Sequence, residues 1–339
     1  MDKSISINKS KTIKVLAIFM MVFHHLFGLI DKTKVSYKSL MVIQGIPIEE
    51  LTGRAMDICV PIFLFLSGYG LYKKYRGNFS FKNAFIRIKK LYQVYLIIFI
   101  IFIGTGHLLG IYKFNLKEMI LNLLTISSSY NREWWFLNLY ILLIILYPLT
   151  SKVIKKLSFK KCLALIFILD FLGLVILKLE FKYEISDMIL NLINTFLVRQ
   201  VMFNLGNLVA KYGIFDKWIK KLKLKKTTSF IILLIVSILL IFRVDLPVID
   251  QYIYIGLEFI FIFMLVILVK ENSNLIALSK HTTNIWLTHT FFCYYLFKEI
   301  AFFPKYSVLI FIWNIILSLM SSTVVNYISK IIIENKKFP

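Results

Sequence analysis

Long apolar runs alternate with short polar segments along nearly the whole chain. A helix needs about 20 residues, at about 1.5 Å each, to cross roughly 30 Å of hydrocarbon, and unsatisfied backbone groups in lipid allow only helices or a closed barrel. The apolar runs have helical length and cover residues 13–30, 55–72, 91–111, 134–151, 162–177, 188–210, 228–243, 251–269, 282–298 and 307–329. We therefore predict an all-α polytopic membrane protein, a bundle of about ten transmembrane helices.

Composition supports this assignment and argues against a set of soluble domains. The 339 residues are 59% hydrophobic and only 17% charged, and the mean hydropathy is +0.77. Thirty-one Phe and 18 Tyr supply lipid-facing and interfacial aromatic surface, while 13 Gly and 6 Pro leave little material for long loops. We expect one transmembrane domain over residues 1–339, with no appended soluble domain. The expected location is the plasma membrane.

The net charge of +23 reports topology rather than a nucleic-acid partner. Lys and Arg lie between the apolar runs instead of on one amphipathic face, so we expect membrane lipids and no nucleic acid around this protein. With the first run crossing outward, 28 of these cations fall in inner segments and 12 in outer ones. Cytoplasmic loops carry the excess of Lys and Arg, so both termini are predicted to be cytoplasmic.

Titratable residues inside the apolar runs are the first candidates for chemistry. A charged side chain at that depth costs several kcal/mol unless it is paired or hydrated, so each is a functional candidate by default. Interhelical hydrogen bonding is the structural alternative for every one of them. No cysteine has metal-type spacing, and no metal site is predicted. The intramembrane titratable residues are His24, His25, Asp170, Arg199, Glu258 and His289.

Lys14 and His25 form the most suggestive pair in the first run. They are eleven residues apart, which at about 100° per residue brings them within roughly 20° of one helix face and about 16 Å apart along the axis. The Lys14 cation at the cytoplasmic end of the helix could attract an anionic cofactor. The deeper His25 imidazole could take a proton from a hydroxyl group. Equally, Lys14 could be a topology anchor and His25 a packing residue. His24 points about 100° away and fits packing or a supporting contact better.

The predicted outer segment 112–133 differs from the other connections. Residues 117–126 read as a short amphipathic helix at the membrane surface, and residues 127–135 form a polar stretch that ends in two tryptophans. A polar and aromatic outer loop suits a sugar. An ordinary interfacial aromatic belt explains the same residues equally well.

Six segments, in order along the chain, resemble one family. Lys14 and His25 match the pattern of a basic residue, ten others and His, and residues 60–71 read Val-Pro-Ile-Phe-Leu-Phe-Leu-Ser-Gly-Tyr-Gly-Leu. The other four segments are the basic stretch 87–92, the Trp-Phe-Leu to Tyr-Pro stretch 135–148, Arg199 with residues 203–207, and residues 279–289. Together they resemble the acyltransferase-3 family of integral-membrane acyltransferases, whose usual count is ten spans.

Departures from the family pattern occur at three places. The first basic position is Lys14 rather than the commoner Arg, which keeps the charge but loses bidentate geometry. The Arg-x-x-Arg pattern becomes Arg87 to Lys90, and Tyr140 or Ile141 stands where some members have Glu in the fourth span.

The resemblance implies transfer of an acyl group, acetyl above all, from cytoplasmic acetyl-CoA to a hydroxyl of a cell-envelope glycan or lipid-linked sugar. Lys14, Arg87 and Lys90 would hold the nucleotide and pyrophosphate end of the donor by charge-assisted contacts. His25 would be the general base, or alternatively would carry the acyl group itself. Arg199 and His289 would stabilise the developing oxyanion or position the thioester.

Three other interpretations remain open at this stage. A transporter or flippase of glycans or lipid-linked sugars would use the buried Arg and His as ligands, although inverted repeats with broken helices are not visible in the sequence. A non-catalytic sensor or scaffold would use the histidines to respond to pH. A succinyl-transferring enzyme would share every motif with the acetyl-transferring one.

Overall fold

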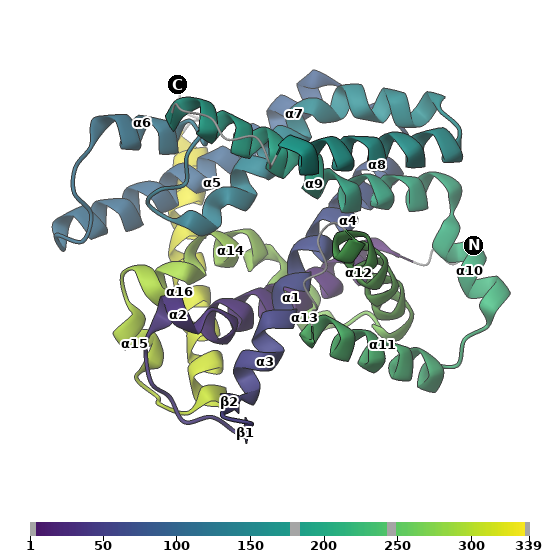
Figure 1. Cartoon of the computed structure of the whole chain (residues 1–339). Helices are drawn as coiled ribbons and strands as arrows, with labels where there is room; N and C mark the ends of the chain where they lie inside the picture. The colour runs from purple at the N-terminus through teal and green to yellow at the C-terminus, as the bar shows by residue number, and fades with distance from the viewer. Residues whose placement is uncertain (1–4, 177–183, 243–248, 336–339) are drawn as a thin grey trace. The chain divides into compact units, whose positions relative to one another are not determined.

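The computed structural model describes residues 5–176, 184–242 and 249–335 (Figure 1). The chain divides into two compact units. Unit 1 is built from Met1–Met20, Ala55–Ser80 and Leu146–Ser279, and unit 2 from Met21–Arg54, Phe81–Ile145 and Lys280–Pro339. Helices make up most of the described residues, which confirms the predicted all-α class.

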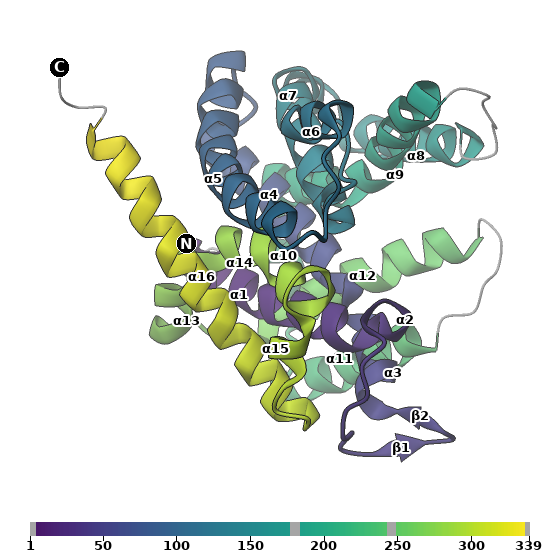
Figure 2. The same ribbon diagram turned by 90° about the vertical axis from the view of Figure 1, so that its left-hand side faces the viewer.

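The helices follow the apolar runs closely over most of the described chain. In order they are α1 (Ile7–Phe23), α2 (Ile30–Thr33), α3 (Ile48–Ala55), α4 (Cys59–Tyr75), α5 (Phe81–Leu108), α6 (Leu116–Leu123), α7 (Trp135–Lys156), α8 (Phe159–Ile176), α9 (Glu184–Tyr212), α10 (Ile214–Leu222), α11 (Lys226–Ile241), α12 (Ile249–Leu268), α13 (Ser273–Leu278), α14 (Thr282–Thr290), α15 (Lys298–Phe302) and α16 (Ser307–Asn335). A β-hairpin of β1 (Val42–Ile43) and β2 (Ile46–Pro47) precedes α3, as Figure 2 shows.

Six helical segments of the described residues are long and apolar enough to cross a membrane, or seven if the bent pair α10–α11 counts as one span. They are Ile7–Gly28, Ile48–Tyr75, Phe81–Leu108, Arg132–Lys156, Asp250–Leu268 and Ser307–Ile332. The chain is thus a polytopic membrane protein. The runs at 162–177 and 188–210 form α8 and α9, which are helices but fall outside this set. The count of ten spans and the cytoplasmic termini stay predictions.

The run predicted at 282–298 is not one α-helix. It begins as α14, widens into the π-helical segment Phe291–Tyr295, and stops before α15. The backbone N–H groups of Leu296 and Phe297 both donate to the carbonyl of Phe291, at 2.9 Å, which closes the wider turn. Hydrophobic periodicity cannot reveal such a change, because π-turns are short insertions in otherwise helical sequence.

Close packing of α4 on α9 organises unit 1 and explains part of the 60–71 motif. A Cβ atom at Gly68 would lie 1.9 Å from the carbonyl oxygen of Phe203, and one at Gly206 would lie 2.1 Å from that of Phe65. Because glycine has no Cβ atom, it lets the two helix backbones approach this closely. Small residues serve the same purpose at many contacts between membrane helices. Gly68 and Gly206 are therefore packing residues of unit 1.

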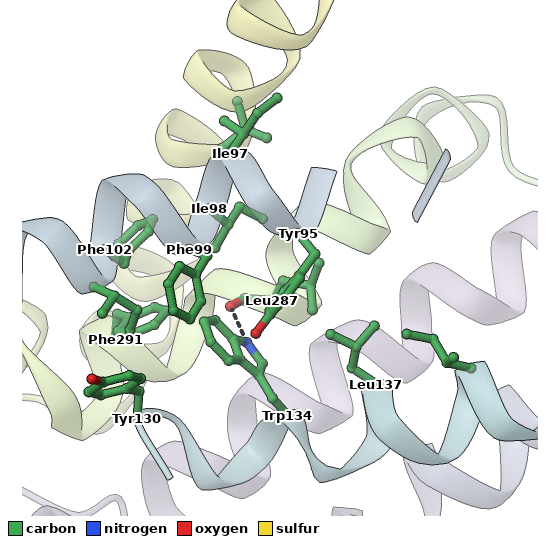
Figure 3. Packing of buried hydrophobic residues seen from close by; sticks show 13 residues of the cluster. Tyr95, Ile97, Ile98, Phe99, Phe102, Tyr130, Trp134, Leu137, Leu287 and Phe291 are labelled. Carbon is green, nitrogen blue, oxygen red and sulfur yellow. Dashed lines mark hydrogen bonds between the residues drawn. The ribbon is translucent and has the colours of Figure 1, made fainter. Parts of the chain in front are cut away.

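The core of unit 2 is aromatic and centres on Trp134 (Figure 3). The indole is packed against Tyr95 and Phe291, with ring centroids 5.0 and 5.5 Å away in edge-to-face geometry. Its Nε1–H donates to the carbonyl of Leu287 in α14 at 3.0 Å, the bond drawn as a dashed line in Figure 3. This cluster joins α5, the start of α7 and α14.

The short helix expected at 117–126 is present as α6, Leu116–Leu123. Asn115 caps it, because its Oδ1 accepts a hydrogen bond from the N–H of Glu118 at 3.1 Å. The hydroxyl of Tyr95 donates to the carbonyl of Asn122 at 2.8 Å and ties α6 to α5. The location of α6 at the membrane surface stays a prediction.

Candidate active site

Three titratable side chains from distant parts of the sequence meet inside unit 2. His25 lies in the π-helical segment His24–Gly28, Glu133 in the 3-10 turn Arg132–Trp134, and His289 near the end of α14. Nε2 of His289 is 2.9 Å from Nδ1 of His25, and Nε2 of His25 is 3.4 Å from Oε2 of Glu133. Both histidines are buried. The structure therefore brings together two of the predicted catalytic residues, His25 and His289, and adds a carboxylate.

Further polar contacts fix each histidine. Nδ1 of His25 is also 3.0 Å from the carbonyl oxygen of Met21, one turn earlier. Nδ1 of His289 is 2.9 Å from two carbonyl oxygens of its own helix, those of Ile285 and Trp286. The two rings lie with their centroids 4.9 Å apart. Neither imidazole can rotate without breaking contacts, so the pair is preorganised.

Lys32 supplies the positive charge at this site. Its Nζ donates to Oε1 of Glu133 at 2.7 Å, while the other carboxylate oxygen faces His25. The Glu133 side chain is 12% exposed and that of Lys32 is 42% exposed. The carboxylate is thus largely removed from water, whereas the ammonium group still reaches solvent. This arrangement balances the charge of Glu133 without requiring a proton from the imidazole.

The turn that presents Glu133 is held from both sides. Asn131 begins it, with Oδ1 accepting from the N–H of Glu133 at 3.1 Å and Nδ2 donating to Oγ1 of Thr290 at 2.8 Å. The N–H of Arg132 donates to the hydroxyl of Tyr295 at 2.8 Å. Both partners belong to the α14 region, so the carboxylate is positioned relative to His289 by direct contacts.

The π-helical segment that carries His25 crosses α3 at two glycines. A Cβ atom at Gly28 would lie 2.5 Å from the carbonyl oxygen of Gly53, and the same carbonyl is 2.8 Å from Nδ1 of His24. π-turns of this kind occur often at functional sites because they redirect one side chain. His24 therefore has the supporting contact that the sequence favoured, and the glycine pair fixes the backbone beside His25.

Replacing Gly28 with alanine is expected to destabilise unit 2 and to impair any activity that depends on His25. The new Cβ atom would collide with backbone rather than with a flexible side chain, and overpacking of this kind costs about 1–3 kcal/mol. Gly104→Ala on α5 is the matched control, since no atom from outside its own helical turns lies within 4 Å of the place its methyl group would take. Thermal unfolding of each purified variant in detergent measures its stability. Equal melting temperatures for Gly28→Ala and Gly104→Ala would contradict the prediction.

The predicted donor-binding cations belong to different units. Lys14 lies on α1 within unit 1. Arg87 and Lys90 lie near the start of α5 in unit 2, where Nε of Arg87 donates to the hydroxyl of Tyr140 at 2.8 Å and Lys90 is exposed. The same-face argument for Lys14 assumed a regular α-helix as far as residue 25. It is weakened because α1 ends at Phe23 and the π-helical segment begins at His24.

Arg199 lies in unit 1, on α9, and lines a pocket of about 180 Å³. Glu258 of α12 lines the same pocket, which places the two charges that the sequence left as possible partners around one cavity. Asp170, which is also a buried carboxylate of unit 1, accepts a hydrogen bond from Nε2 of Gln251 at 2.7 Å. A structural role fits this last residue.

Glu133 is the functional candidate that the sequence did not single out. It stands in a polar stretch just outside an apolar run, where a carboxylate is unremarkable. One local signal was available, because Asn131 two residues earlier is a typical cap and fixes the start of a turn and helix. That signal predicts the turn but not the imidazole facing it, which comes from a distant part of the sequence.

Comparison with known proteins identifies a family for this chain. A sequence profile described as an acyltransferase domain, that of the acyltransferase-3 group, matches residues 8–330, nearly the whole chain. No curated protein and no solved structure matches the chain significantly. The resemblance noted from the six ordered segments is confirmed.

Proposed function

Because this chain belongs to the acyltransferase-3 family, we propose that it is a membrane O-acyltransferase acting on a sugar. The donor is cytoplasmic acyl-CoA, with acetyl as the acyl group, and the acceptor is a hydroxyl of a cell-envelope or exported glycan or of a lipid-linked sugar. The enzyme resides in the plasma membrane. The contact that carries this proposal is the buried His25 imidazole held between His289 and the carboxylate of Glu133.

An imidazole in this setting suits general-base catalysis. In the proposed reaction Nε2 of His25 takes the proton of the acceptor hydroxyl while the oxygen attacks the thioester carbonyl carbon. The new C–O ester bond forms, the C–S bond breaks, and the proton passes on to the departing CoA sulfur. The imidazolium that exists between these steps lies 3.4 Å from the Glu133 carboxylate, which stabilises its charge.

The acceptor would approach Glu133 from the segment that leads into α7. Residues 127–135 are polar and aromatic, and on the predicted topology they face the outside of the cell. Sugars present hydroxyl groups at their edges and C–H groups on their faces, so they are bound well by amides, carboxylates and aromatic rings. This chemistry supports a glycan acceptor over a purely apolar alcohol.

The donor would enter from the opposite side, where the positive charge is concentrated. Lys14, Arg87 and Lys90 belong to the predicted cytoplasmic ends of α1 and α5, and cations there would hold the phosphates of CoA. Arg199 would position the thioester or its oxyanion. The narrow pantetheine arm could then pass between helices toward the imidazole.

Arg87→Gln is expected to raise the KM for acyl-CoA about tenfold with little change in kcat. A charge-assisted hydrogen bond contributes about 1.5–3 kcal/mol, and the loss would weaken donor binding in ground and transition state alike. Lys82→Gln, an exposed cation on the first turn of the same helix, is the control. Steady-state kinetics with varied acyl-CoA separates the two constants. A fall in kcat at constant KM would assign Arg87 to the chemical step instead.

Mass spectrometry of envelope glycans tests the proposed function directly. Glycans from cells with the gene should carry an increment of about 42 Da for acetyl, or about 100 Da for succinyl, that is absent from cells without it. A His25→Ala strain should lack the increment as well. Transport of a glycan by reconstituted vesicles without acyl-CoA, together with unmodified glycans, would favour the transporter interpretation and contradict the proposal.

A further inference from the structure

The protonation pattern of His289 follows from its contacts. Its Nδ1 faces the carbonyl oxygens of Ile285 and Trp286, and a carbonyl oxygen can only accept a hydrogen bond. Nδ1 must therefore carry the hydrogen. In the neutral ring the other nitrogen, Nε2, then has a lone pair and acts as an acceptor.

The same reasoning extends to His25. Its Nδ1 is 2.9 Å from the accepting Nε2 of His289 and 3.0 Å from the carbonyl oxygen of Met21. Two acceptors face this one nitrogen, so it carries a ring hydrogen. The carboxylate of Glu133 faces Nε2, so Nε2 also carries a hydrogen while His25 is charged, and Nε2 is the nitrogen that loses its proton when His25 becomes neutral. The lone pair of neutral His25 is consequently on Nε2, the nitrogen on the side of Glu133. The hydrogen bonds run in one direction from His25 to His289 to the α14 backbone.

We infer that His289 is a positioning residue, which fixes the Nδ1–H tautomer of His25 and so directs the basic lone pair of Nε2 toward the acceptor hydroxyl. The inference rests on the proposed function for its consequence in catalysis. It replaces direct oxyanion stabilisation as the role of His289, because both nitrogens of that ring are already engaged.

The arrangement works in both protonation states of His25. While the imidazole is neutral, Lys32 balances the charge of Glu133, and Nε2 stays available to a hydroxyl donor. After proton transfer both ring nitrogens of His25 are donors, and each has an acceptor, His289 and Met21 on one side and Glu133 on the other. The site thus accommodates the imidazolium without moving the ring, which lowers the cost of the proton-transfer step.

Substitutions of similar size at position 289 separate tautomer control from packing. Gln can place its amide oxygen where Nε2 of His289 lies and keep an acceptor for His25, whereas Leu removes it and the shorter Asn cannot reach. We expect His289→Leu and His289→Asn to lower kcat about tenfold with unchanged KM for both substrates, and His289→Gln to recover most of the loss. His107→Leu is the control, since that imidazole bonds to the carbonyl of Ile103 in its own helix.

The kinetic results distinguish tautomer control by His289 from a packing role. A kcat for His289→Leu equal to that of the wild type would overturn the inference, as would equal losses for the Gln and Leu variants, which indicate packing alone. The proposed function fails by a different result, wild-type turnover in His25→Ala. Its failure therefore cannot be confused with that of the tautomer assignment.

Solid-state NMR of protein labelled with ¹⁵N-histidine in lipid bilayers tests the tautomer without any enzyme assay. The chain has five histidines, and the His25→Ala variant identifies the signals of His25 by difference. In the neutral state of His25 we expect a protonated Nδ1 and a bare Nε2 in the wild type, with the Nε2–H form appearing in His289→Leu. A neutral ring with a hydrogen on Nε2 and a bare Nδ1 in the wild type would overturn the inference.

Discussion

His25→Ala is expected to abolish acyl transfer while leaving the protein at normal levels in the membrane. A positioned general base contributes about 10²–10⁴-fold to a reaction, and here the same ring would also deliver the proton to the leaving thiolate, so we expect a loss of about a thousandfold or more. The substitution leaves a small cavity and removes no charge partner that Glu133 needs, because Lys32 remains. Acyl transfer in isolated membranes, normalised by immunoblot, measures the effect.

His107→Ala serves as the control for this prediction, because it removes another imidazole of unit 2 whose Nδ1 bonds to its own helix. Unchanged acyl transfer in His25→Ala would exclude His25 as the base. The same variant also addresses the covalent alternative. If His25 carried the acyl group, wild-type protein incubated with labelled acyl-CoA and no acceptor would retain label, and the variant would not.

The periodic apolar pattern predicted the helices of this protein but not their interruptions. Runs such as 91–111 and 307–329 became α5 and α16 because lipid leaves the backbone no alternative to internal hydrogen bonding. The π-helical segments at His24–Gly28 and Phe291–Tyr295 were invisible. A single inserted residue in a helical turn has no signature in hydrophobicity, since its neighbours are apolar on every side.

The sequence predicted the two histidines of the candidate site but not its carboxylate, and the difference has a physical reason. His25 and His289 stood out because a titratable group within an apolar run is costly and needs an explanation. Glu133 lies at the edge of such a run, where charge is inexpensive, so its sequence position carried no comparable signal. Its importance arises from the contacts of Asn131 and Trp134 with α14, and a single sequence does not encode such long-range pairings in any local pattern.

Glu133→Gln is expected to lower kcat about a hundredfold while KM for acyl-CoA stays unchanged. The amide is nearly isosteric, so the turn should persist, but the imidazolium of His25 would lose the carboxylate 3.4 Å away and keep the ammonium group of Lys32 nearby. A hydrogen bond to a charged group contributes about 1.5–3 kcal/mol, which corresponds to roughly ten- to a hundredfold, and repulsion from the unbalanced cation adds to it.

Removing Lys32 as well distinguishes these two effects. The Lys32 side chain is 42% exposed, so solvent screens part of its repulsion, and Lys32→Gln alone should cost less than Glu133→Gln. In the double variant the imidazolium lacks its counterion but no longer faces an unbalanced cation, so activity should exceed that of Glu133→Gln alone. A double-mutant cycle on kcat measures this coupling. Strictly additive losses would show that Lys32 and Glu133 act independently, and that the carboxylate does not serve His25 as part of a charge-balanced pair.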